Sequence, residues 1–131
     1  MNFKYLKTFE SYNKFNLADE SFTRLANLCF ETGSVDEMKM FVDRGADLND
    51  EEIDFNEIVM EEERFEFFMN NGGNIDNIMV NNRTKYMLES EEYQRIIIKA
   101  GFIEFLKNNN ILDDSLRSEF PDQFYSLDLA I

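Results

Sequence analysis

The chain has 131 residues, of which 44% are hydrophobic and 15% aromatic, so it can bury one core of its own and is too apolar for a disordered acidic tail. Asp and Glu number 27 against 13 Lys and Arg, for a formal net charge of −14, and because such a surface repels phosphate, direct nucleic-acid binding is not expected. Histidine is absent, which excludes Ser-His-Asp and Cys-His catalysis and every zinc site that needs imidazole.

The composition predicts one cytoplasmic domain over residues 1–131. No stretch approaches the roughly 20 apolar residues of a membrane span, and the first residues lack an apolar run of signal-peptide length. The single cysteine, Cys29, stands between Leu28 and Phe30 in an apolar stretch, which indicates a buried thiol in a reducing compartment.

Residues 1–16 are predicted to form an amphipathic helix that packs on the rest of the chain. Its apolar side chains lie at helical spacing. They include Phe3, Leu6 and Phe9. Lys4 and Lys7 make the local charge positive, unlike that of the chain as a whole.

The next two predicted helices form a pair. Apolar side chains recur at the spacing of one helical face over residues 19–31, and Gly33 ends that helix. The residues at that spacing are Phe22, Leu25, Ala26 and Cys29. Ser34 then caps a second helix, with Glu37 three residues later as in a capping box, and Gly45 ends it.

The same pattern returns twice. Residues 61–70 and 90–100 each carry an apolar stripe and lead into a glycine, which predicts one helix in each. The β-branched run 96–98 is also typical of a strand, but charged residues flank it and no alternating partner strand follows, so a buried helix is predicted.

The last part of the chain is predicted to cap the helix pairs. A short helix is expected near residues 102–106, a loop at 108–110, and a further helix at 113–120 that ends by the only proline. Residues 124–131 are apolar enough to dock, so 113–131 are assigned to a C-terminal cap.

The helix-ending glycines recur at near-regular intervals. Gly45, Gly72 and Gly101 lie 27 and 29 residues apart. Such spacing of helix pairs predicts a stacked array over residues 19–109, in which each unit buries its apolar face on the next. The fold class is therefore predicted to be all-α, as stacked helical hairpins or as a small helical bundle.

Residues 26–49 resemble the body of an ankyrin repeat. One helix ends at Gly33, a second follows, and the segment from Gly45 to Asn49 reads Gly-Ala-Asp-Leu-Asn, where the family has Gly-Ala-Asp-Val-Asn. The resemblance covers about residues 22–76 and extends weakly to 101. The threonine-proline turn of the family is absent, and the spacing falls short of the usual 33 residues. The resemblance implies a non-enzymatic protein-protein interaction module whose contacts come from turns and exposed helix faces.

Residues 1–12 are similar to the openings of many small proteins of tailed bacteriophages. Together with the net charge of −14, this similarity implies an alternative function. The chain would be a phage-encoded inhibitor of a host nucleic-acid-handling or defence protein, for example of the CRISPR type. It would act in the host cytoplasm by occlusion or by acidic mimicry of nucleic acid.

Two acidic runs are the predicted contact surface for the partner. The first is Asp50, Glu51 and Glu52, and the second is Glu61, Glu62 and Glu63. The alternative interpretation is a solvated face, or a helix N-terminus at which negative charge meets the helix dipole. The predicted partner is a protein, either basic or nucleic-acid-binding, and a homodimer through an exposed apolar end remains open.

No catalytic, cofactor-binding or metal-ligating residue is assigned. Gly72-Gly73 lacks the lysine of a phosphate-binding loop. The alternating acids from Asp43 to Asp54 weakly match a calcium loop but have Leu48 in place of its required glycine. An enzyme would require a magnesium site formed by carboxylates, and the many Asp and Glu residues make no one pair stand out.

Overall fold

The computed structural model describes residues 19–129, and this part of the chain is all helical, as predicted. The predicted helix over residues 1–16 lies outside the described residues. The α-helices are α2 (Asp19–Thr32), α3 (Val35–Asp43), α4 (Phe55–Val59), α5 (Glu62–Asn70), α6 (Asn82–Leu88), α7 (Glu91–Lys99), α8 (Ile103–Asn108) and α9 (Pro121–Leu129). Two 3-10 helices, η1 (Ile75–Asn77) and η2 (Asp114–Ser118), lie in the connections.

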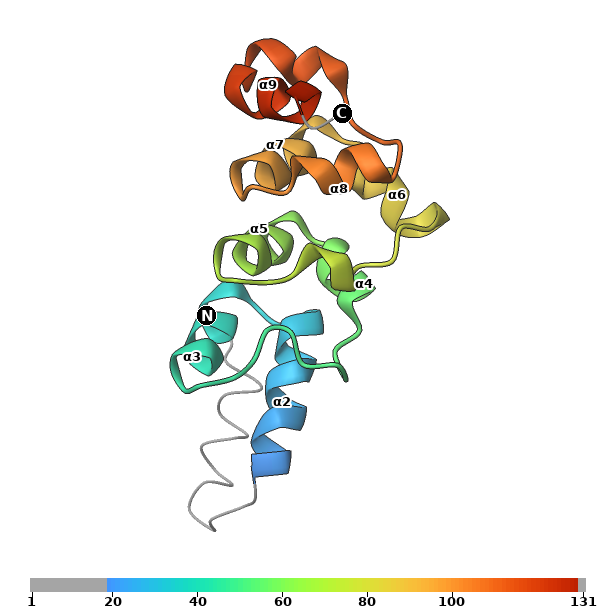
Figure 1. The fold of residues 1–131 in the computed structure, drawn as a ribbon. Coiled ribbons are helices and arrows are strands. Elements are labelled where there is room, and N and C mark those ends of the chain that lie inside the picture. The colour runs from blue at the N-terminus through green and yellow to red at the C-terminus, as the bar shows by residue number, and fades with distance from the viewer. Residues whose placement is uncertain (1–18, 130–131) are drawn as a thin grey trace.

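The helices stack as hairpins in two rows (Figure 1). Consecutive helices pair as α2 with α3, α4 with α5, and α6 with α7. The first row is α2, α4 and α6, each packed on the next, and the second row is α3, α5 and α7. Helix α8 packs on α7 and on α9, and α9 closes that end of the stack. Each helix is too short to be stable alone, so packing on its neighbours holds it in place.

Each second-row helix ends in the same left-handed turn. The φ angles of Gly45, Gly72 and Gly101 are +95°, +92° and +95°, a region that glycine enters without steric cost. The amide that follows each glycine donates back to a carbonyl five residues earlier, as in a Schellman motif. These bonds are Ala46 N to Phe41 O (3.0 Å), Gly73 N to Phe68 O (2.8 Å) and Phe102 N to Ile97 O (3.1 Å).

A fourth turn of this kind uses asparagine. Asn110 has a φ angle of 58°, and the Ile111 amide donates to the Leu106 carbonyl at 3.0 Å. Asparagine is one of the few residues besides glycine that tolerate this conformation. The turn ends α8, and the predicted loop over residues 108–110 begins one residue late because Asn108 is still helical.

Helix starts agree less closely with the sequence analysis. Ser34 is the N-cap of α3, as predicted, and its side chain accepts from the Glu37 amide at 3.3 Å. The Glu37 carboxylate lies beside Cys29 Sγ, inside the core. The capping box that the structure contains belongs to α6, where Asn81 and Thr84 exchange side-chain-to-backbone bonds.

One predicted helix is wrong in type, and two helices were missed. A further helix is predicted over residues 113–120, but only the 3-10 helix η2 forms there. Pro121 then opens α9 as its first residue, a position where its missing amide hydrogen costs nothing. Helices α4 and α6, the first members of the second and third hairpins, were not predicted.

One continuous core runs through the stack. Its largest fully buried side chains are phenylalanines, namely Phe30, Phe41, Phe65, Phe68 and Phe124. Cys29 is wholly buried, as predicted, and burial, with the adjacent Glu37 carboxylate, raises the pKa of its thiol well above the usual range. Because the thiolate is the reactive form, this thiol is inert at neutral pH.

Tyr93 joins the second and third hairpins. It lies in α7, its hydroxyl donates to the Val59 carbonyl of α4 at 2.6 Å, and its ring stacks on Phe65 with centroids 4.9 Å apart. Burial, reinforced by the nearby Glu62 carboxylate, raises the pKa of Tyr93 to about 12.

We expect this tyrosine to make the fold sensitive to alkali. Because its folded pKa lies above the unfolded value of about 10, its contribution is complete below pH 10 and is lost as the pH rises toward 12. Between pH 10 and pH 12 the wild type should lose up to about 2–3 kcal/mol more unfolding free energy than the Tyr93→Phe variant. Urea unfolding of both proteins at pH 8 to 12 measures the difference. Cys29 also titrates above neutral pH but is common to both, so parallel curves would contradict the assignment to Tyr93.

Candidate interaction surface

The turns after α3 and α5 are built in the same way. After the left-handed glycine, the side-chain oxygen of an Asp or Asn accepts a hydrogen bond from the backbone amide two residues later. These bonds run from Asn49 N to Asp47 Oδ1 (2.8 Å) and from Asp76 N to Asn74 Oδ1 (3.0 Å). Between each pair stands a buried aliphatic side chain that anchors the turn to the core. These side chains are Leu48 and Ile75.

Asn49 connects the first turn to the second. Its Nδ2 donates to the Gly72 carbonyl (2.9 Å), and its Oδ1 accepts from Asn74 N (2.7 Å) and Asn77 Nδ2 (3.2 Å). The oxygens of Asp47 and Asn49 that matched a calcium loop therefore have structural partners. Within residues 19–129 the structure contains no group of three Asp, Glu or Cys placed to hold a metal ion.

The first predicted acidic run lies in the loop between α3 and α4, and its members differ in role. Asp50 is half-buried, and its Oδ1 accepts from Asn27 Nδ2 of α2 (3.1 Å) and from the Glu52 amide (2.9 Å). Asp50 thus holds the loop on the first row. Glu51 and Glu52 are exposed and remain available to a partner.

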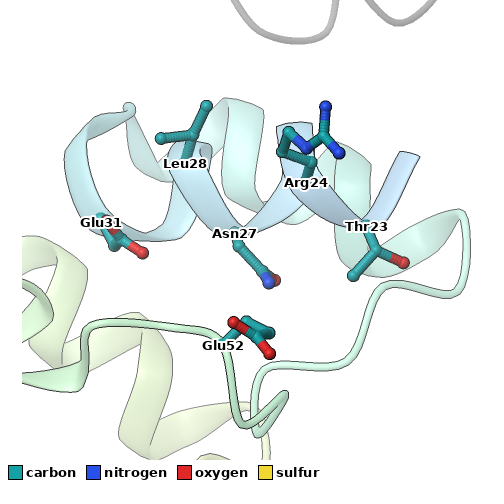
Figure 2. Close-up of a pocket in the computed structure, with 6 residues that line it drawn as sticks. All are labelled: Thr23, Arg24, Asn27, Leu28, Glu31 and Glu52. Carbon is teal, nitrogen blue, oxygen red and sulfur yellow. The ribbon is translucent and has the colours of Figure 1, made fainter. Parts of the chain in front are cut away.

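A groove of about 600 Å³ runs along α2, and Glu52 of this loop is among the residues that line it. It is lined by Thr23, Arg24, Asn27, Leu28, Glu31 and Glu52. Figure 2 shows Asn27 pointing toward the loop that carries Glu52, whereas Leu28 and Arg24 point to the other side of α2. The groove mixes charges of both signs, so its electrostatics favour no single class of ligand.

The second predicted acidic run opens α5. Glu61 is the N-cap of the helix, and its side chain pairs with Arg64 at 2.5 Å. Glu62 and Glu63 are exposed in the first turn of α5, where the helix dipole stabilises negative charge.

The structure places Glu62 and Glu63 on opposite sides of α5. Glu63 lines a groove of about 380 Å³ toward α3, together with Val35, Glu66, Phe67, Asn70 and Asn71. Glu62 lines a groove of about 240 Å³ toward α7, together with Glu66, Asn70, Glu92, Arg95, Ile96 and Lys99. Neither groove includes a residue of the first acidic run. Sequence reasoning missed Glu66, which lines both grooves.

Large apolar side chains are also exposed on the stack, and the sequence analysis did not single them out. They are Leu28, Met79, Tyr86, Tyr125 and Leu129. Tyr86 of α6 is the most exposed of these, at 81%. Tyr and Met are enriched in protein interfaces, and the available signal was that Tyr86 follows four polar residues at the start of α6.

Residues 19–129 thus form a stack of helical hairpins with an acidic, grooved second row and, in the described part, no helix able to cross a membrane. No protein-family model, curated protein or solved structure matches the chain.

Proposed function

We propose that the chain is a non-enzymatic protein-protein interaction module of ankyrin-like helical form. The supporting observation is the repetition of one unit: a helix pair, a left-handed glycine, an Asx turn and a buried aliphatic anchor, stacked in two rows. Stacked repeats create long exposed surfaces that bind other proteins. The module would work in the cytoplasm, or in a host cytoplasm if a virus encodes it.

The test is capture of a partner on the immobilised full chain from nuclease-treated lysate, at low and at high salt. We expect one or a few proteins to be retained after nucleic acid is removed. The control is the same full chain, heat-denatured before it is immobilised. Retention of the same proteins on both columns, or of none on the folded chain, would contradict the proposal.

A second candidate function is inhibition of a nucleic-acid-handling or defence protein by acidic mimicry. It is favoured by the net charge of −14 and by the exposed carboxylates of Glu62, Glu63 and Glu66 along α5. The bacteriophage resemblance that also suggested it lies outside the described residues. Mimicry requires that the captured partner be released by salt and by competing nucleic acid. A captured partner that neither salt nor nucleic acid releases would contradict mimicry and would indicate an ordinary adaptor.

A further inference from the structure

The second row offers a groove with an apolar floor and a charged rim. Val35 of α3 and Phe67 of α5, both partly buried, lie on the floor of the 380 Å³ groove. Glu63 and Glu66, both exposed, stand at its rim on α5. Space of this size, apolar below and polar at the edge, suits an apolar side chain whose neighbours stay in water.

The rim carboxylates are not neutralised by the protein. Some carboxylates elsewhere on the stack are paired, as Glu57 is with Arg83 and Glu119 with Arg95. Among residues 19–129 no ion pair or hydrogen bond engages the side chains of Glu62, Glu63 or Glu66. The potential over α5 is therefore negative and is free to attract a cation-bearing partner.

From this geometry we infer that the groove between α3 and α5 binds a basic amphipathic segment of a partner protein. One apolar side chain enters between Val35 and Phe67, and flanking Lys or Arg residues meet Glu63 and Glu66. Nucleic acid is repelled by the same carboxylates, and a second copy of this chain, at −14, is repelled as well. The inference rests on the proposed function and specifies the partner's chemistry.

The probes are synthetic helical peptides of about 15 residues, the length at which isolated helices become stable. One carries Lys on its polar face and a stripe of Leu, a second has Glu in place of Lys, and a third has Ser in place of Leu. Fluorescence anisotropy on the full chain should show binding of the first peptide that weakens with salt. Binding of the second and third should be at least about tenfold weaker.

Charge reversal locates the binding site. The double substitution Glu63→Lys and Glu66→Lys should weaken binding of the basic peptide about tenfold or more, because two attractions become repulsions. Glu51→Lys with Glu52→Lys makes the same change of net charge on the α3–α4 loop and should alter affinity less than about twofold. All four residues are exposed, so both variants should fold.

Equal weakening by the two double variants, or no binding of the basic peptide to the wild type at millimolar concentration, would overturn the inference. Partner capture separates this failure from that of the proposed function. A protein captured equally by the wild type and by the Glu63→Lys, Glu66→Lys variant would leave the module intact and place its contact elsewhere. Loss of capture by that variant alone supports the groove.

Discussion

Replacing Gln94 by Leu is expected to cost about 2–4 kcal/mol of unfolding free energy, although the volume hardly changes. Gln94 lies wholly buried in α7. Its Nε2 donates to the carbonyls of Leu88 (3.2 Å) and Ile111 (2.5 Å), and its Oε1 accepts from the Asp113 amide (2.8 Å). Leu would leave all three backbone groups without this partner, and unpaired buried groups cost roughly 1–3 kcal/mol each before relaxation. Urea unfolding measures the loss.

Gln123→Leu is the matched control. Gln123 is half-buried in α9, and its side chain makes no hydrogen bond within residues 19–129, so the same substitution there should stay within about 0.5 kcal/mol. Hydrogen exchange should also be faster at Asp113 in Gln94→Leu, because the loop beyond α8 loses its attachment to α7. Comparable losses in the two variants would show that Gln94 does not hold that loop.

Those features that depend on neighbours in the sequence could be predicted. Gly45, Gly72 and Gly101 were identified as helix ends because glycine is the residue least strained at positive φ, and all three adopt it. The buried helix at residues 96–98 was also predicted correctly, since flanking charges argued against a strand.

Helices α4 and α6 were missed for a physical reason. Phe55–Val59 is only five residues long, too short to show a helical period. Asn82–Leu88 buries only Thr84 and Leu88, so it lacks an apolar stripe. Their helical state comes from packing between neighbouring hairpins, which no local pattern records.

The roles of the acidic residues depend on tertiary contacts. Asp50 and Glu51 are neighbours of the same chemistry, yet Asp50 bonds to Asn27, 23 residues earlier, and Glu51 is exposed. Likewise the grooves beside α5 exist only because α3 and α7 flank it. Composition could therefore indicate an acidic surface but not which carboxylates face a groove.

Adding a single methyl group at Gly73 is expected to destabilise the fold by about 3 kcal/mol or more. A β-carbon there would lie 2.4 Å from Cδ2 of Phe68, and that ring is fully buried, so neither the ring nor the turn can move away cheaply. The Gly73 amide also donates to the Phe68 carbonyl at 2.8 Å, which fixes the turn against the ring.

The neighbouring glycine, Gly72, separates the steric cost of an added methyl group from the cost of backbone strain. Gly72 has a φ angle of +92°, and a β-carbon added there would meet no atom within 4 Å beyond its two chain neighbours, so Gly72→Ala should cost only the left-handed strain of about 1–2 kcal/mol. A double-mutant cycle then tests the clash: Phe68→Leu makes room, so the loss in Gly73→Ala with Phe68→Leu should fall short of the sum of the single losses. Additive losses would mean that the cost at Gly73 arises in the backbone of the turn and not at the phenylalanine ring.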